Sequence, residues 1–379
     1  MKTPLFCPNP RCPYHDDDSR PKDWFIRKGF YSTGDGSRIQ RYQCSHCRRR
    51  FSSKTFSIDY FAKTFLEYRR LLTYLSSGMS LRALGRVFGH SPKTIAGKIS
   101  RLARQIIAFN QRVHRLIALT EDLVADGFES FVVSHYFPNN INLLVGKDSQ
   151  FVYDLTYAQL RRKGAMTTEQ KAKARVYRME FPLPAAQIPV SFTHLMRSTM
   201  ALFRQSAEKD HLTVYTDEKK EYRAPLAGYV TAGLPASQGK VVSHHQTPSS
   251  APRTLQLPTF SANYIDREVR KDMAEHHRES VCFARNVVAS LERLVCYLFH
   301  HNYFKPFRIN RRDREYATHA EAAGIAAATI RKLMYQLFTR RAFFTRQNLQ
   351  LPGELLWRRA YPTPKKFFCN PLPAFILAG

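Results

Sequence analysis

Acidic residues are scarce in this sequence: the 379 residues include 30 Asp and Glu against 59 Lys and Arg, which gives a formal net charge of +29. Such a surplus of positive charge repels itself unless a polyanion neutralises it. Long hydrophobic runs are lacking too, because the longest, residues 294–299, has six residues and a membrane span needs about 20. The N-terminus has no hydrophobic leader. We therefore expect a cytoplasmic, nucleoid-associated protein that does not use a membrane and whose partner is nucleic acid.

The positive charge is unevenly distributed along the chain. Residues 1–110 carry a net charge of +14, residues 111–260 carry +5, and residues 261–379 carry +10. A hydrophobic fraction of 44% is sufficient for packed cores, and the length favours two or three domains. The pattern predicts a nearly balanced folded core between two basic arms. A basic protein that its charge merely keeps soluble is the simpler alternative.

Four of the seven cysteines fall within the first 50 residues. They are Cys7, Cys12, Cys44 and Cys47. The C-x4-C and C-x2-C pairs can converge on one tetrahedral Zn²⁺, and strand-like segments 24–31 and 39–43 lie between them. We expect a zinc ribbon over residues 1–56, whose Zn is structural because so small a module needs metal to fold. His15 and His46 could compete as ligands, and disulfides are the disfavoured alternative.

Residues 57–115 have the pattern of a helix-turn-helix. Apolar residues recur at helical spacing over 61–77, Ser80 can cap a short helix, Gly89 supplies a turn, and Ser91 with Pro92 can begin a second helix. In DNA-binding proteins the second helix of this motif enters the major groove. The face that we expect to be exposed carries Lys93, Thr94, Lys98, Arg101 and Arg104. A plain helical hairpin is the alternative.

After residue 118 the pattern becomes a mixture of strands and helices. We expect strands at 123–130, 139–146, 150–157, 211–217 and 240–244, a helix at 192–206, and one long helix over 264–303. This order predicts a multidomain α/β protein whose residues 118–308 form a mixed sheet of ribonuclease-H type with flanking helices.

Two acids interrupt apolar strands: Asp126 lies within the first strand and Asp217 ends a later one. For a single acid, an outward-facing position is the simpler explanation. A pair of carboxylates is what a Mg²⁺ or Mn²⁺ site requires, because these ions prefer oxygen ligands. The expected long helix could add a third from Asp272, Glu275 or Glu279, which are spaced along roughly one face.

The order of zinc ribbon, helix-turn-helix and acid-bearing core resembles bacterial insertion-sequence transposases of the DDE class. Residues 266–286 look like the stretch around the third acid of one such group, and residues 300–308 resemble its usual continuation. The likeness covers roughly residues 5–310, but the first cysteine pair has four intervening residues instead of the commoner two.

The resemblance implies that Asp126, Asp217 and Glu279 form a triad for catalytic Mg²⁺ or Mn²⁺. It implies cleavage of element ends in double-stranded DNA, strand transfer into target DNA, and a homo-oligomer when the ends are brought together. Basic residues beside the acids could hold the DNA strand or face solvent; they are Arg270, Lys271, Arg278 and Arg285. Residues 309–379 read as a basic accessory segment.

Two other functions fit the same pattern. A repressor or domesticated transposase would keep the DNA-binding modules without cutting, and a ribonuclease-H-type nuclease would cut without strand transfer. A pure DNA-binding protein has no need for a complete set of acids, which favours the enzyme.

Overall fold

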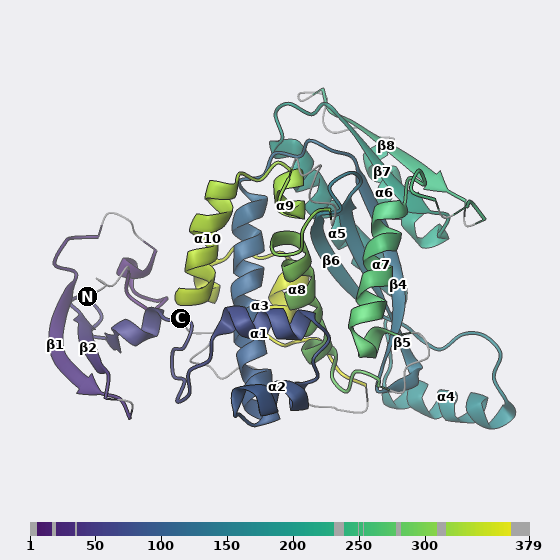
Figure 1. The fold of residues 1–379 in the computed structure, drawn as a ribbon. Coiled ribbons are helices and arrows are strands. Elements are labelled where there is room, and N and C mark those ends of the chain that lie inside the picture. Colours follow the sequence, from purple (N-terminus) through teal and green to yellow (C-terminus); the bar gives the residue numbers. More distant parts are fainter. Residues whose placement is uncertain are drawn as a thin grey trace.

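The computed structural model describes residues 6–16, 20–34, 36–230, 239–248, 250–252, 254–277, 282–308 and 316–364. It is a mixed α/β structure with a small three-stranded sheet near the N-terminus and a five-stranded sheet in the body (Figure 1). Within the described part, no helix has the length and apolar character that crossing a membrane demands.

The N-terminal sheet is antiparallel and consists of β1 (Phe25–Ser32), β2 (Arg38–Cys44) and β3 (Arg50–Ser52). The short 3-10 helices η1 (Pro13–His15) and η2 (Ser53–Phe56) flank it. Its core is small and aromatic: the rings of Trp24 and Tyr42 both stack on Phe51. The strands expected between the two cysteine pairs are confirmed.

This module is tied to the C-terminal part of the chain at the 3-10 helix η5 (Phe344–Arg346). The ring of Phe6 lies 4.8 Å from that of Phe343, and the buried His15 shares a hydrogen bond of 2.8 Å with the Thr345 hydroxyl. His15 therefore fixes the module to the body, and its other ring nitrogen is 2.7 Å from the Cys7 carbonyl oxygen.

Three helices follow: α1 (Tyr68–Ser76), α2 (Leu81–Phe88) and α3 (Pro92–His114). The expected caps are present, since the Ser80 hydroxyl accepts from the Ala83 N–H and the Ser91 hydroxyl accepts from the Thr94 N–H. Gly89 has φ of +66°, a left-handed conformation that favours glycine and lets the chain turn between α2 and α3.

The first helix is shorter than its sequence pattern predicts. Phe61 and Phe65 precede it and are 69% and 54% exposed, so their expected place on a buried stripe is wrong. The buried face of α1 begins at Tyr68, whose hydroxyl donates to Asp59 at 3.0 Å.

The prediction that this face of α3 is exposed is wrong beyond the first turn of the helix. Lys93 is exposed and Thr94 is half-buried, but Lys98 is 4% exposed and pairs with Asp59 at 2.5 Å. Arg101 donates to the carbonyl oxygens of Ile58 and Tyr60, at 3.2 and 2.8 Å. Arg104 is 5% exposed and donates to the Ser100 hydroxyl. These cations serve internal packing because α3 is enclosed along most of its length.

The main sheet has the strand order β6-β5-β4-β7-β8. The strands are β4 (Leu123–Val132), β5 (Ser134–Gly146), β6 (Val152–Gln159), β7 (His211–Asp217) and β8 (Val241–Thr247). β5 is antiparallel to both β4 and β6, whereas β4, β7 and β8 are parallel. Every strand expected from the sequence is present.

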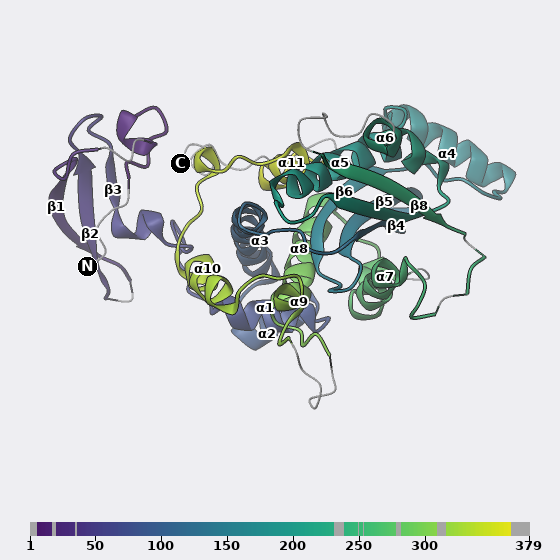
Figure 2. The same cartoon turned by 90° about the horizontal axis from the view of Figure 1, so that it is seen from above.

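Helices cover both faces of this sheet, with α7 (Phe260–Asp272) on one side and α5 (Gln187–Gln205) and α6 (Lys220–Val230) on the other (Figure 2). The helix α4 (Thr168–Glu180) follows β6 and projects from the body (Figure 1). The sequence pattern identified α5 but missed α4 and α6.

The single long helix expected over 264–303 is wrong. α7 ends at Asp272, the 3-10 helix η4 (Ala274–His276) follows, and α8 (Val287–Tyr303) begins after a break. The chain turns at Met273, which is extended and buried. This turn lets His276 bury its ring against β4, 2.9 Å from the Ser130 hydroxyl.

The C-terminal part contains α9 (His319–Ala322), α10 (Ala327–Thr339) and α11 (Leu351–Trp357). α10 and α11 pack against α3, which also packs along α8. One hydrophobic cluster runs continuously from Ile58 to Leu356. Residues 57–115, the sheet and the C-terminal helices therefore share a core.

The ion pair between Lys98 and Asp59 yields a stability prediction. Lys98→Ala leaves the Asp59 carboxylate enclosed without its cation, so we expect the free energy of unfolding to fall by about 3 kcal/mol. Urea denaturation measures this effect. Lys93→Ala, a change at an exposed position of the same helix, should alter it by less than about 0.5 kcal/mol. Equal effects of the two substitutions would contradict the internal role of Lys98.

Candidate functional site

The four N-terminal cysteines converge on one point. Their sulfur atoms all lie within 4.8 Å of one another, with Cys7 and Cys47 3.5 Å apart and Cys12 and Cys44 3.7 Å apart. A tetrahedral Zn²⁺ with Zn–S bonds of about 2.3 Å separates its sulfur ligands by about 3.8 Å. The cluster therefore fits a metal ion such as Zn²⁺. His46 Nδ1 lies 3.8 Å from Cys12 Sγ, at the rim of this cluster.

The surroundings of the sulfurs explain why a cation belongs there. Burial raises the pKa of Cys12 to about 11 and raises that of Cys7 as well. Burial also acts to raise the pKa of Cys47, but hydrogen bonds, first that with the Arg49 backbone, lower it to about 7. Without a positive charge Cys7 and Cys12 therefore remain thiols. A bound divalent cation reverses this preference because the thiolate is the form that coordinates metal.

Asp126 and Asp217 lie on adjacent parallel strands. β4 pairs with β7 through Leu123 opposite Val214 and Val124 opposite Tyr215. The same offset, continued two residues further, sets Asp126 opposite Asp217. Neighbouring strands are about 4.8 Å apart, so the register alone brings the two acids together.

A third acid, Asp266, approaches this pair from α7. That helix packs on β4 and β5 through a buried stripe that includes Ala262, Ile265 and Val269. Asp266 borders the stripe, and its carboxylate accepts from Arg270 Nε at 2.7 Å. The charge of Asp266 contributes less than that of Asp217 to raising the pKa of Asp126, so Asp266 lies in the neighbourhood of the pair.

The pKa of Asp126 is raised by its burial and by the neighbouring negative charges. Burial, the carboxylate of Asp217 and, more weakly, that of Asp266 raise this pKa to about 7. The Gly127 N–H, which donates to Asp126 Oδ1 at 2.7 Å, and the charge of Lys219 oppose the rise. Mg²⁺ and Mn²⁺ prefer carboxylate oxygens as ligands, but among the described residues only the four cysteines form a close ligand cage.

The other acids that the sequence offered as a third ligand pair with other residues or lie outside the described part of the chain. The Asp272 carboxylate accepts from the Tyr297 hydroxyl at 2.7 Å, and Glu275 pairs with Arg293 at 2.5 Å. Both bind α8. Glu279, the acid that the resemblance favours, lies outside the described residues, as does Arg278.

Arg270 has a positioning role. Besides Asp266, its guanidinium donates to the carbonyl oxygens of His276 and Glu129, at 3.1 and 3.0 Å. It therefore connects α7, η4 and β4, and orients the Asp266 carboxylate. Lys271, by contrast, is 64% exposed and pairs with Glu268.

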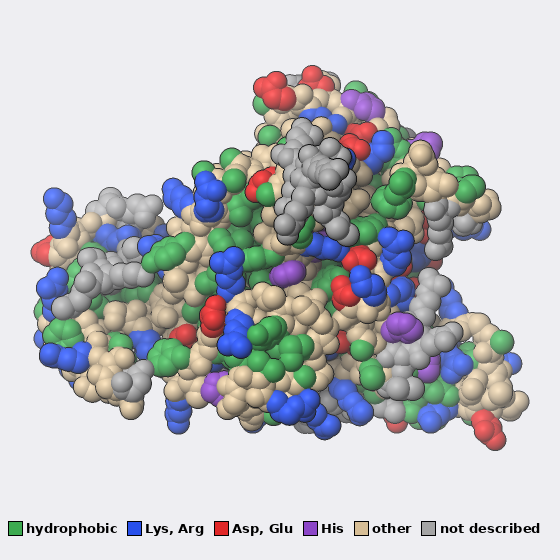
Figure 3. All heavy atoms as spheres, viewed as in Figure 1, with side chains coloured by type: hydrophobic (Ala, Val, Ile, Leu, Met, Phe, Trp, Pro, Cys, Tyr) green, Lys and Arg blue, Asp and Glu red, His purple; other side chains and the backbone are tan. Residues whose placement is uncertain are grey.

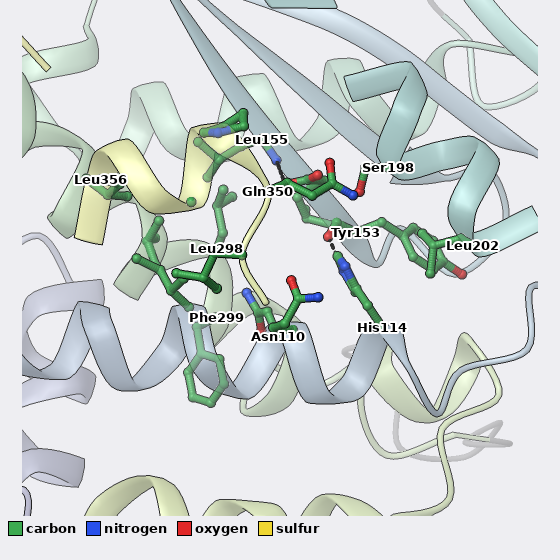
Figure 4. A pocket seen from close by; sticks show the side chains of 18 of the residues that line it. Asn110, His114, Tyr153, Leu155, Ser198, Leu202, Leu298, Phe299, Gln350 and Leu356 are labelled. Carbon is green, nitrogen blue, oxygen red and sulfur yellow. Dashed lines mark hydrogen bonds between the residues drawn. The ribbon is translucent and has the colours of Figure 1, made fainter. Parts of the chain in front are cut away.

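A cavity lined by polar and apolar side chains is separate from the acids. It has a volume of about 380 Å³ and lies between α3, β6, α5, α8 and α11 (Figure 4). Asn110, His114, Ser198 and Gln350 give it a polar lining beside apolar side chains. None of the three clustered acids lines it.

Comparison of the sequence with known protein families and with curated proteins found no match.

The sequence pattern placed Asp126 and Asp217 on strands but missed Asp266 as their partner. One signal was present, since Asp266 and Arg270 are four residues apart on an expected helix. Which acid of this region lies near Asp126 and Asp217 depends on how α7 is rotated on the sheet and on the end of this helix at Asp272.

The cysteine geometry predicts one Zn per chain. Cys44→Ser in the full chain should abolish the stoichiometric Zn measured by atomic emission and unfold the N-terminal sheet, because this small module lacks another sufficient core. Cys282→Ser is the matched control, since Cys282 is exposed and outside the cluster, and it should keep its Zn. A Cys44→Ser protein with bound Zn and an ordered N-terminal sheet would contradict this assignment.

The raised pKa of Asp126 predicts a pH-dependent effect on stability. An acid whose pKa rises on folding destabilises the folded protein once it ionises, so the cost grows from about pH 4 to pH 7 and then stays constant. We expect Asp126→Asn to increase the free energy of unfolding of the metal-free protein by about 2 kcal/mol at pH 8. The gain should vanish near pH 4.

Urea denaturation at several pH values measures the gain. Glu129→Gln, a change of an exposed acid on the same strand, serves as the control and should have no such effect. An Asp126→Asn protein less stable than wild type at pH 8 would show that Asp126 is not under electrostatic strain.

Proposed function

We propose that the chain is a DNA transposase of the DDE class that cleaves the ends of its element and transfers them to target DNA with Mg²⁺ or Mn²⁺. The observation that carries the proposal is the position of Asp126 and Asp217 on adjacent parallel strands, with Asp266 on the helix α7 that packs on β4 and β5. The strand order β6-β5-β4-β7-β8, with one antiparallel strand between parallel ones, supports a ribonuclease-H-like core.

The acids supply the chemistry by holding divalent cations. When bound, Mg²⁺ activates the attacking oxygen and stabilises the leaving oxygen of a phosphodiester. Asp126, Asp217 and Asp266 offer oxygen ligands from rigid elements, and the ionisation of Asp126 is favoured by a neighbouring cation. Arg270 keeps Asp266 oriented through its bond of 2.7 Å. The remaining task is to position DNA.

The DNA-binding part of the proposal is a helix-turn-helix formed by α2 and α3. The exposed first turn of α3, with Lys93 and Thr94, offers its N-terminal residues to the major groove, and Arg82 and Arg86 of α2 are exposed nearby. The N-terminal module with its structural Zn adds basic surface. Two copies of the chain would hold the two element ends together, as a homo-oligomer on DNA in the nucleoid.

A non-cutting repressor and a nuclease without strand transfer are the rival functions. The acids weigh against the repressor, because the charge of Asp217 beside Asp126 destabilises a protein that binds no cation. The presence of joined DNA products separates the transposase from the nuclease.

We expect Asp126→Asn, Asp217→Asn and Asp266→Asn each to reduce Mg²⁺-dependent cleavage of DNA carrying the element ends by about 1,000-fold. The amide keeps the shape of the side chain but removes its charge, so DNA binding should survive. Asp272→Asn and Glu275→Gln are the controls and should retain at least about half of the activity. Gel assays of cut and joined products measure both steps.

Glu279→Gln completes the series. Normal cleavage by Asp266→Asn, together with loss of cleavage in Glu279→Gln, would show that Glu279 and not Asp266 is the third ligand. Binding without cleavage by the wild-type protein would favour the repressor.

A further inference from the structure

The helix α4 lies at the margin of the hydrophobic core, which it contacts through the half-buried Tyr177. None of its 13 residues is buried, and Figure 1 shows it projecting beyond the lower end of β5. Its first turn is stabilised locally, since Thr167 and Gln170 form a reciprocal capping box. A capped helix without buried residues contributes little to folding, so its exposed surface needs another explanation.

One face of α4 is anchored at the tip of the β4–β5 hairpin. The ring of Tyr177 lies 5.3 Å from that of Tyr136 and 5.2 Å from that of Phe137. The cations of Arg162 and Lys173 lie over the Tyr136 ring, at 5.0 and 5.7 Å. These contacts hold α4 in a defined orientation on the sheet.

Another face of α4 presents a row of cations. Lys171, Arg175 and Arg178 are exposed, occur at positions i, i+4 and i+7, and make no ion pair with a described residue. They line a groove with Met166, Ala174 and Met179. Residues 161–178 contain seven Lys and Arg and one acid. Figure 3 shows Lys and Arg side chains along the lower edge of the molecule, the edge at which α4 lies.

The cationic row lies beyond the acids along the direction of the strands. β4, β6 and β7 run in one direction, but β7 ends at Asp217 near the level of Asp126, whereas β6, which α4 follows, ends at Gln159 near the level of Ser130. Six residues separate Asp126 from the end of β4 at Val132. This corresponds to about 20 Å of strand.

We infer that α4 is a DNA-binding surface whose Lys171, Arg175 and Arg178 contact backbone phosphates of the duplex, away from the phosphodiester held by the acids. The inference rests on the proposed function. The three cations span about 10 Å of helix axis, and a duplex of that length carries about six phosphate charges. Charge complementarity favours DNA over a protein partner, because Met166 and Met179 are the only apolar side chains besides Ala174 lining the groove.

The test uses the full chain with Lys171, Arg175 and Arg178 all changed to Ala. Anisotropy titrations with a labelled mixed-sequence duplex of about 40 base pairs, from about 50 to 200 mM KCl, give affinity and salt dependence. The matched control changes Arg115, Arg331 and Lys332 to Ala, which removes the same charge from exposed positions elsewhere. Alanine favours helix and no altered α4 residue is buried, so circular dichroism should remain unchanged.

Loss of three phosphate contacts should weaken binding about 10- to 100-fold and reduce the slope of log K against log salt by about 2 to 3. The control should stay within about threefold of wild type. An α4 variant that binds as well as the control overturns the inference, and points to a protein partner for the groove. If the wild-type chain binds no duplex, the proposed function fails as well; if it binds and cleaves DNA while the α4 variant matches the control, only this inference fails.

Discussion

The repulsion between Asp126 and Asp217 is the constraint on which the account of the site depends. Parallel pairing of β4 with β7 brings these carboxylates to one register position, and the pKa of Asp126 rises to about 7 as a result of burial and this neighbouring charge. A fold that draws acids together in this way loses stability unless a cation compensates. The approach of Asp266, oriented by Arg270, adds a further negative charge to the same place.

The surrounding structure keeps this arrangement rigid. α3 packs along α8 and against the C-terminal helices, so the elements that precede the sheet share its core. The ion pair of Lys98 with Asp59 and the bonds of Arg101 to the 58–60 backbone secure the segment that enters α1. Lys98, Arg101 and Arg104, which the sequence suggested for DNA, therefore stabilise the body, whereas Lys93 of α3 and cations of α2 and α4 are exposed.

Local signals in the sequence were sufficient for much of the fold. The cysteine spacing, the caps at Ser80 and Ser91, the turn at Gly89 and all five strands of the main sheet could be predicted, because each depends on neighbouring residues. The rotation of α7, the break at Met273 and the burial of Lys98 could not, because they follow from contacts between distant segments. For the same reason the strand acids were found but Asp266 was not, and the choice of Glu279 rested on resemblance.

The central claim is that Asp126, Asp217 and Asp266 together bind a divalent cation. Electron paramagnetic resonance of Mn²⁺ titrated into the full chain measures this directly, because bound Mn²⁺ loses the signal of the free ion. The account predicts tight Mn²⁺ binding at about pH 8 that Asp266→Asn weakens at least about tenfold and Glu275→Gln leaves unchanged. Equal Mn²⁺ affinity of the wild type and Asp266→Asn would contradict it.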